Sequence, residues 1–322
     1  MMPSVLCVRT WMIFYAHLLV RSAIEWVYES LKSKFNEVSI NWGPKISYLG
    51  QTFDFSKAPT LKVTMEGYVA DLLNASGVNG MAATPVLENL FDTTKNQELL
   101  NDEDKENFHS LVAKLLYLSK RVRPDLLLVT NFLSTRVSCP TIGDMEKLNR
   151  VPSYLHSTQD FGINIDVNSN IHVIAYVDAS YAVHKDFKSH AGAMISVGRG
   201  PVYVKSTKQM INTKSSTEAE IVAVSDALSQ IIWVRDFLAE QGYTLGPAKL
   251  LLDNTSSVLM LERGEATAEK SRHIGIRFFF AKDKIDSGEI AIEWLATGDM
   301  IADILTKPLQ GELFRVLRYK LS

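Results

Sequence analysis

Apolar residues recur at helical spacing in several parts of the first half of the chain. Between residues 102 and 121 they form one continuous stripe, and Pro124 follows, which predicts a helix that ends before the proline. The same spacing predicts an amphipathic helix over residues 22–35 and a further helix that begins near Glu66. The first half is therefore expected to be rich in amphipathic helices.

Two runs of alternating residues lie between these helices. They are "KISYLGQTFDF" and "TLKVTME", and the turn at residues 56–59 separates them, which predicts a β-hairpin with one strand for each run. A helical layer is expected to continue to about His156. Pro152 should break or kink it, because proline removes a backbone donor and clashes with the preceding turn.

The apolar run "WMIFYAHLLV" near the amino terminus spans ten residues between Arg9 and Arg21. A membrane-spanning helix needs roughly 20 apolar residues, so we expect no membrane span. No small-x-small cleavage site follows the run, and we do not expect a secreted protein. The run is interpreted as a buried helix or as a misplaced start of the chain.

The pattern changes after Asn168. Three β-rich runs, "IHVIAYVDASYA", "AGAMISVGRG" and "PVYVKSTKQ", predict an antiparallel meander. A long helix should follow over residues 216–241, ended by Gly242. Then come the strand "KLLLDN", helical residues 255–286, the strand "EIAIEWLAT" and a last helix that begins near Gly298. This order predicts an α/β fold.

Three aspartates stand beside apolar residues in these elements. Asp178 follows "VIAYV", Asp253 follows "KLLL", and Asp303 lies between Ile301 and Ile304. Buried carboxylates are costly unless they are paired, hydrogen-bonded or bound to a metal, so several of them near strand ends suggest a cation site. Taken singly, Asp253 also fits a helix-capping residue, because Asp-Asn-Thr is a good helix start.

Two glutamates, Glu218 and Glu220, open the long helix. Helical spacing puts Glu220 on the apolar face with Val224 and Leu228, so it should point toward the sheet. Glu218 shares a mostly polar face, and its place in the first turn suits a capping acid, with Ser215, Ser216 or Thr217 as the N-cap. Glu220 is therefore the candidate metal ligand of the two.

Four stretches, "AYVDASYA", "KQMINTKSSTEAEIVAVSDAL", "LLLDNTSSV" and "MIADILTKPL", resemble the ribonuclease H domain of copia-type (Ty1/copia) retrotransposon polyproteins. In the first half, "SYLGQTFDFS", "HSLVAKLLYLSKRVRPDLLL" and "FLSTRV" resemble the end of the reverse transcriptase of the same polyprotein. The resemblance implies a ribonuclease H-like mixed five-stranded sheet with flanking helices, preceded by a partial α+β reverse transcriptase region. It also implies the divisions 1–167, 168–310 and a tail, 311–322.

The resemblance assigns the family's metal-binding carboxylates to Asp178, Glu220, Asp253 and Asp303. It implies that they hold two Mg²⁺ or Mn²⁺ ions, that Asp178 bridges both ions, and that the reaction is hydrolysis of the RNA strand in an RNA–DNA hybrid. Hard oxygen ligands suit these cations. The expected partner is the hybrid, and the expected location is a cytoplasmic particle or the nucleus.

Basic residues support a nucleic-acid substrate. The formal net charge is −2, which does not decide the partner, but residues 187–217 contain five basic residues and no acid. Lys205, Lys208 and Lys214 are the candidate phosphate contacts from this stretch, and the alternative is a strand edge protected by lysines. In the first half, Lys120, Arg121 and Arg123 are expected to add further phosphate contacts.

Departures from the family pattern leave alternatives open. The chain contains no Asp-Asp pair, so polymerisation is not expected, and residues 1–22 resemble no part of the family and suggest an artefact of the predicted gene. Gly275 and Phe279 replace an acid and a histidine that are usual in the family. One alternative is a non-catalytic remnant, for which Pro152 is evidence, and another is an integrase-type strand transferase.

The carboxylate order helps to weigh the second alternative. Integrases usually carry two aspartates followed by a glutamate, whereas the order here is Asp, Glu, Asp, Asp.

The sequence leaves the oligomeric state open. The residues from 168 onward contain their own meander, their own helices and a complete set of acids, and we expect them to fold and bind metal alone.

Overall fold

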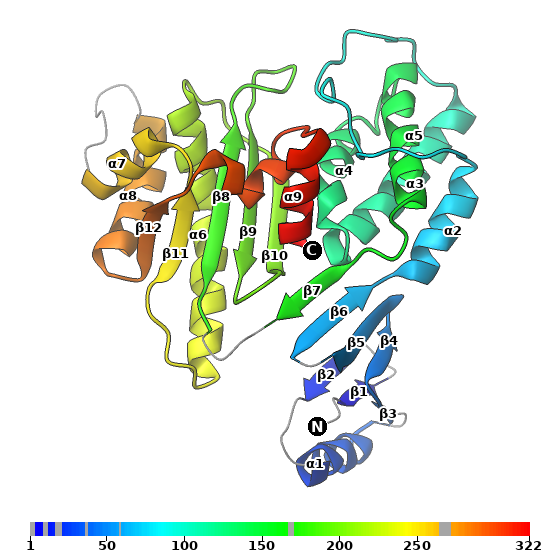
Figure 1. The fold of residues 1–322 in the computed structure, drawn as a ribbon, viewed down its shortest axis with the longest axis vertical. Helices are drawn as coiled ribbons and strands as arrows, with labels where there is room; N and C mark the ends of the chain where they lie inside the picture. The colour runs from blue at the N-terminus through cyan, green and yellow to red at the C-terminus, as the bar shows by residue number, and fades with distance from the viewer. Residues whose placement is uncertain are drawn as a thin grey trace.

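The computed structural model describes residues 4–8, 12–16, 21–35, 38–57, 59–166, 171–263 and 272–322. Figure 1 shows a small β-rich part at the amino terminus, a helical layer beside it, and a second sheet with its own helices. No helix in these described ranges is long and apolar enough to cross a membrane.

The first half of the chain contains strands and then helices. The strands β1, β2 and β3 form one antiparallel sheet in the order β2-β1-β3, and β4 to β7 form a second in chain order. The elements are β1 Ser4–Val8, β2 Met12–Ala16, α1 Arg21–Lys32, β3 Val38–Trp42, β4 Lys45–Tyr48, β5 Gln51–Lys57, β6 Thr60–Thr64, α2 Glu66–Ser76, α3 Asp102–Arg121, η1 Pro124–Leu126, α4 Leu127–Ser134, α5 Ile142–His156 and β7 Ile163–Asp166.

The second half builds a mixed sheet of five described strands in the order β10-β9-β8-β11-β12. The first three are antiparallel neighbours, and β11 lies parallel to both β8 and β12. The elements are β8 Ile174–Ser180, β9 His190–Ser196, β10 Pro201–Lys208, α6 Ser216–Glu240, β11 Ala248–Leu252, α7 Thr255–Arg263, α8 Arg272–Asp286, β12 Ile290–Trp294, η2 Thr297–Asp299, η3 Ile301–Leu305 and α9 Gly311–Leu321. The predicted α/β class with a mixed five-stranded sheet and flanking helices is confirmed.

Most elements lie where the apolar pattern predicted them. The stripe between residues 102 and 121 is α3, and α6 runs from Ser216 to Glu240 before Gly242, whose φ of +88° allows the left-handed turn that ends it. The predicted hairpin is correct for β5 and β6. The first run, however, is itself a hairpin, because Leu49 and Gly50 both take positive φ and reverse the chain between β4 and β5.

Three further expectations were wrong. Pro152 lies inside α5 and does not break it, since the helix continues to His156; the Ser153 hydroxyl donates to the carbonyl of Asn149, 3.1 Å away. Residues 12–16 of the amino-terminal run form a strand, not a helix, and residues 17–20 lie outside the described ranges. The expected last helix is divided into η2, η3 and α9, and Pro308 lies at the break between η3 and α9.

Two faces of the five-stranded sheet are covered by different elements. Apolar residues of β8 and β9 that point to one side, among them Val177 and Ile195, pack with Ala223, Val224 and Ile231 of α6 in a single core. The opposite face carries Met194, which belongs to a second core together with η3 and α9. Strand residues alternate between the two sides, so the same alternation that buries Val177 turns its neighbour Asp178 toward η3.

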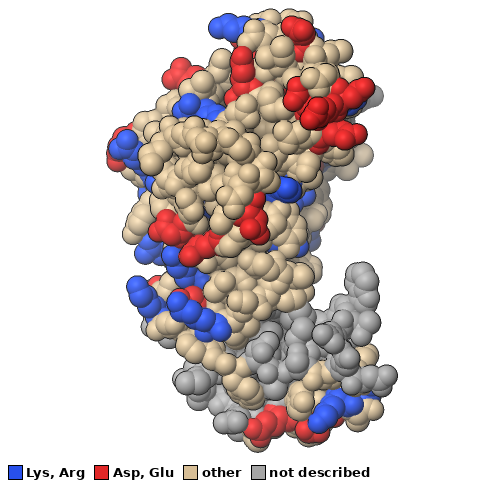
Figure 2. Space-filling view, turned by 90° about the vertical axis from the view of Figure 1, so that its right-hand side faces the viewer, with Lys and Arg blue, Asp and Glu red and all other residues tan. Residues whose placement is uncertain are grey.

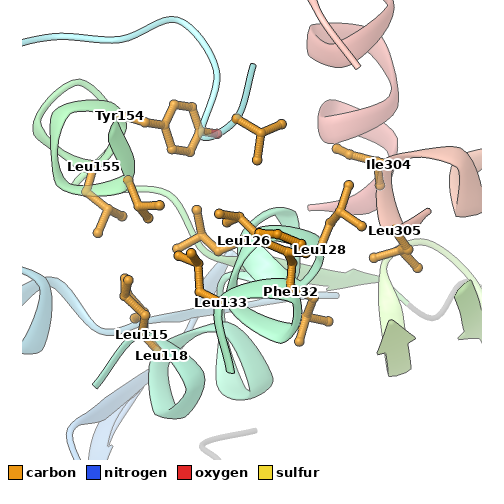
Figure 3. Close-up of a cluster of buried hydrophobic side chains, with 14 of the residues drawn as sticks. Leu115, Leu118, Leu126, Leu128, Phe132, Leu133, Tyr154, Leu155, Ile304 and Leu305 are labelled. Carbon is orange, nitrogen blue, oxygen red and sulfur yellow. The ribbon is translucent and has the colours of Figure 1, made fainter. Parts of the chain in front are cut away.

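The second core joins the two halves of the chain. Phe314, Leu317 and Leu321 of α9 are buried in it together with Leu126 and Tyr154 of the first half. Figure 1 shows α9 between the sheet and the helical layer, and Figure 3 shows Ile304 and Leu305 beside Leu128 and Phe132. The predicted boundary at residues 167–168 falls in residues 167–170, which lie outside the described ranges.

Candidate metal centre

Asp178 lies near the carboxyl end of β8, on the face that η3 covers. Its side chain is 2% exposed, and burial raises the pKa of this carboxyl, against the opposing effects of Lys307 and of the hydrogen bond that the Thr306 hydroxyl donates to Oδ2. A buried carboxyl that two donors reach from one neighbouring segment is held in a fixed direction.

Asp253 follows β11, which runs parallel to β8 with Leu251 opposite Tyr176. The carboxyl ends of parallel strands meet at one edge of a sheet, and this register brings Asp253 level with Asp178. The alternative of a helix-capping aspartate does not describe Asp253. It is the Asn254 side chain that accepts a hydrogen bond from the backbone N–H of Ser256 at the start of α7, at 2.9 Å.

Asp303 is brought to the same edge by the close packing of η3 on β9. Gly192 of β9 lies opposite Asp178, and a Cβ there would come within 2.7 Å of Thr306 Cγ2 and 2.8 Å of Leu305 Cβ. A larger residue would therefore push η3 off the sheet. Burial, and then the charge of Asp178, raise the pKa of Asp303 to about 7.

These three aspartates form one cluster. Asp178, Asp253 and Asp303 each offer a carboxylate oxygen, and the three oxygens lie within 4.8 Å of one another. Lys307 reaches the same place, with Nζ 2.7 Å from Asp303 Oδ1 and 3.5 Å from Asp178 Oδ1. Burial opposes the charge on Lys307, but the carboxylates outweigh it and raise the pKa of this ammonium group. A cation is therefore stabilised where the carboxylates converge.

Glu220 points inward from the first turns of α6, as its helical face predicted. It is 6% exposed, and burial raises its pKa to about 7, with smaller contributions from the charges of Asp178 and Asp253. Asn254 Nδ2 donates to Oε1 at 2.8 Å, whereas Oε2 is buried without a hydrogen-bond partner among the described residues. Glu220 stands outside the group of three within 4.8 Å but close enough to couple with it electrostatically.

Glu218 has the capping role that the sequence predicted. Ser215 is the N-cap of α6 and accepts a hydrogen bond from the backbone N–H of Glu218 at 3.2 Å. The Glu218 carboxylate in turn accepts one from the backbone N–H of Lys214 at 2.7 Å. The predicted division between the two glutamates agrees with this geometry.

The donor set fits a divalent cation. Oxygen ligands from Asp178, Asp253 and Asp303 converge, and a fourth carboxylate oxygen, Oε2 of Glu220, is buried with no hydrogen bond in the described residues. An orphaned buried carboxylate oxygen costs free energy that a cation would recover. Oxygen-only ligands with several carboxylates are those that Mg²⁺ and Mn²⁺ prefer.

The predicted nucleic-acid contacts are distributed unevenly. Lys205 of β10 lies in an open groove of about 480 Å³ that Lys120 and Arg121 also line, between β10 and the α3–α4 segment. Lys208 pairs instead with Asp186 at 2.8 Å, and Lys214 lies in the loop before α6. Arg123 is not available to a phosphate: it is 1% exposed and pairs with Asp125 at 2.8 Å.

The face of the first half shown in Figure 2 carries acidic and basic side chains in scattered groups, without a continuous positive band. That face is therefore not expected to follow a phosphate backbone.

Several residues of the site were missed by sequence reasoning. Lys307, Thr306 and Gly192 have the contacts described above, and Trp294 donates its indole N–H to the carbonyl of Asp253 at 2.9 Å. The spacing of four between Asp303 and Lys307 is the one local signal that would have found a partner of the cluster. The contacts of Gly192 and Trp294, and the bond from Thr306 to Asp178, join residues far apart in the chain.

Comparison with known proteins supports the resemblance over most of the chain. The "Retrovirus-related Pol polyprotein from transposon RE1" of Arabidopsis thaliana is 29% identical over 271 residues, which are 83% of this chain and 18% of that protein. The "Transposon Ty1-DR6 Gag-Pol polyprotein" of Saccharomyces cerevisiae is 24% identical over 311 residues, 91% of this chain and 18% of that protein. This chain is a homologue of copia/Ty1-type Pol polyproteins.

The chain spans about 18% of the length of these Pol polyproteins, and no family model matches it. Among solved structures it is similar to a foamy viral protease-reverse transcriptase in complex with an RNA/DNA hybrid (TM-score 0.47, 9% identity, 88% of this chain and 34% of that one). It is also similar to LC11-RNase H1, isolated from compost (TM-score 0.33, 16% identity, 42% of this chain and 92% of that one).

Proposed function

We propose that this chain is a metal-dependent ribonuclease that hydrolyses the RNA strand of RNA–DNA hybrids. The observation that carries the proposal is the convergence of carboxylate oxygens from Asp178, Asp253 and Asp303, which come from three separate segments, within 4.8 Å. Homology to copia/Ty1-type Pol polyproteins supports the same class of chemistry. The proposal concerns this chain and not the whole polyprotein.

In this proposal Asp178, Glu220, Asp253 and Asp303 hold two Mg²⁺ or Mn²⁺ ions. Bound there, the ions would supply Lewis acidity at the scissile phosphate of an in-line displacement. Other residues of the chain orient these carboxylates. Thr306 donates to Asp178, Asn254 donates to Glu220, and Gly192 allows η3 to pack on the sheet and bring Asp303 to it. Lys307 balances the carboxylates when no cation is bound.

The hybrid is proposed to lie over the carboxylate edge with its backbone reaching the groove beside β10. Lys205, Lys120 and Arg121 line that groove, so it would receive phosphates of one strand. We propose Lys208 and Lys214 as weaker contacts, since Asp186 already neutralises Lys208. We propose that residues 168–310 form the domain that carries this activity. The reaction would take place inside the cell, in a cytoplasmic particle or the nucleus.

We further propose that the chain does not polymerise DNA, because it contains no adjacent pair of aspartates. The non-catalytic alternative loses one argument, since α5 continues through Pro152 and the helical layer is not interrupted. An integrase-type activity is not favoured by the carboxylate order.

The test uses the purified full chain with a labelled RNA–DNA hybrid in Mg²⁺ and in Mn²⁺. We expect cleavage of the RNA strand, no cleavage by the Asp178→Asn variant and no extension of a primed template. Absence of cleavage by the folded chain at every metal concentration would support the non-catalytic alternative. Strand transfer on DNA ends would support the integrase-type one.

A further inference from the structure

A line of buried polar side chains crosses the sheet from the β8–β9 loop to η3. His184 Nε2 lies 3.0 Å from His190 Nδ1, and His190 Nε2 lies 2.8 Å from Ser206 Oγ. Ser206 Oγ donates to the carbonyl oxygen of Leu305 at 2.7 Å. The three side chains are 6%, 0% and 3% exposed, so water does not compete for these bonds.

The direction of every proton in this line follows from its last member. The carbonyl of Leu305 only accepts, so the single hydroxyl proton of Ser206 points to it and Ser206 Oγ accepts from the N–H at His190 Nε2. His190 Nδ1 then carries no proton and accepts from His184 Nε2. His190 must be neutral for this arrangement, because its Nδ1 accepts, whereas the Nε2–H of His184 donates in either charge state. Burial lowers the pKa of His190 to about 3 and that of His184 to about 4.

One end of the line holds the segment that completes the carboxylate cluster. Leu305 stands between Asp303 and Thr306, whose hydroxyl donates to Asp178. A second bond ties the same segment to the sheet, since Ser180 Oγ donates to the carbonyl of Thr306 at 2.9 Å. The chain at the end of η3 is therefore held at the two successive carbonyls of Leu305 and Thr306, close to the side chains of Asp303 and Thr306.

The other end is covered by the first half of the chain. Phe91 packs edge-on against His184 with 5.0 Å between ring centroids and lies 5.8 Å from His190, and Phe132 of α4 stacks with His184 at 6.4 Å. Both phenylalanines precede residue 168. They keep the polar line dry, and a buried polar network is worth more when water is excluded.

We infer that His190 and Ser206 are positioning residues that fix Asp303 and Thr306 at the carboxylate cluster, and that Phe91 and Phe132 of the first half sustain them. The effect of these residues on catalysis rests on the proposed nuclease function. It gives the first half a role that does not require polymerase carboxylates or contact with nucleic acid. Residues that orient metal ligands from behind commonly change metal affinity by about 10- to 100-fold when they are replaced.

The first measurement needs neither metal nor activity. Amide hydrogen exchange of residues 301–307 is compared between the full chain, Ser206→Ala and Ser196→Ala, all without metal. Ser196 is a matched control, because it is also a buried serine of the sheet, 3% exposed, and its hydroxyl donates to Gly198 and not to η3. We expect faster exchange of residues 301–307 in Ser206→Ala alone.

The second measurement follows cleavage of the hybrid against Mg²⁺ concentration. Ser206→Ala should raise the Mg²⁺ concentration for half-maximal activity by about tenfold and lower kcat, with KM for the hybrid unchanged, while Ser196→Ala behaves as the unmodified chain. Phe91→Leu, which is milder and touches no carboxylate, should shift exchange and metal dependence in the same direction by a smaller factor.

The outcomes separate this inference from the proposed function. If the unmodified chain does not cleave hybrids, the nuclease proposal fails, and exchange of residues 301–307 together with Mn²⁺ binding by calorimetry still decides the positioning role. Equal exchange and equal metal dependence in Ser206→Ala and Ser196→Ala would overturn it. A rise in KM for the hybrid, with no change in exchange or in Mg²⁺ dependence, would assign Ser206 to substrate contact and would also overturn the positioning role.

Discussion

Lys307 Nζ lies 2.7 Å from Asp303 Oδ1, one helical turn earlier in the chain. The contact places a positive charge at the point where the aspartates converge, and the carboxylates raise the pKa of Lys307. Burial and the charge of Asp178 raise the pKa of Asp303 to about 7, although Lys307 opposes this shift. An ammonium group and a divalent cation would compete for the same carboxylate charge. This relationship makes Lys307 a probe of the site.

Replacement of Lys307 by Met should strengthen metal binding. The metal-free variant should be less stable at neutral pH, because burial leaves the charges of Asp178 and Asp303 uncompensated, and its rise in Tm on addition of Mg²⁺ should exceed that of the unmodified chain. Lys320→Met is the control, since Lys320 pairs with Asp299 at 2.6 Å outside the cluster. An equal rise in Tm for both variants would show that Lys307 does not compete with the cation.

Asp178→Asn should abolish cleavage and preserve the fold. The metal-free free energy of unfolding should be unchanged or slightly higher, because burial disfavours the charged carboxylate more than the loss of Lys307 and Thr306 as partners costs. Cleavage assays and thermal unfolding at neutral pH measure the two effects. Retained cleavage would remove Asp178 from the proposed metal ligands.

Glu220→Gln should gain stability relative to the unmodified chain as pH rises. The folded-state pKa of Glu220 is raised from 4.5 to about 7, so its favourable contribution is complete below pH 4.5 and is lost as pH rises through 7. Glutamine has no such loss, and the difference in the free energy of unfolding should reach on the order of 3 kcal/mol without metal. Thermal unfolding across that range measures it, and cleavage should be lost.

Glu218→Gln is the matched control for Glu220→Gln. Glu218 caps α6, so its replacement should lower stability by a few tenths to about 1 kcal/mol while most activity remains. Similar losses of cleavage in both variants would show that the helical face does not separate the two roles.

Gly192→Ala should displace η3 from β9. A Cβ at this position would lie 2.7 Å from Thr306 Cγ2 and 2.8 Å from Leu305 Cβ, closer than packed side chains tolerate, at a cost of about 1–3 kcal/mol. Metal affinity and cleavage should fall together with Tm. Gly298→Ala serves for comparison, because nothing lies within 4 Å of the Cβ it adds; the idea fails if the two alanine variants bind Mn²⁺ equally well.

The isolated fragment 168–322 should be less stable than the full chain. Its own meander and helices predicted independent folding, but Phe314, Leu317 and Leu321 of α9 are buried against the first half. Exposure of that face should cause self-association, and a fragment that ends at residue 310 should associate less. Light scattering and Mn²⁺ binding compare the three chains. A monomeric 168–322 fragment with full metal affinity would show that the first half is dispensable.

The sequence by itself determined the elements and the direction of the main site residues. Helical spacing predicted α3 and α6 and turned Glu220, but not Glu218, toward the core, because side-chain direction within one helix depends only on local geometry. The antiparallel order of β8, β9 and β10 followed from short connections between β-rich runs. Local signals failed at the Leu49–Gly50 turn and at Pro152.

Only the tertiary structure decided how the site is assembled. Asp303 reaches Asp178 because Gly192 admits η3, and Ser206 reaches Leu305 across 99 residues of chain. Arg123, which by its charge suggested a phosphate contact, is instead buried with Asp125. Such contacts join residues far apart in the chain, and no periodicity encodes them, since they depend on how the two cores pack against one another.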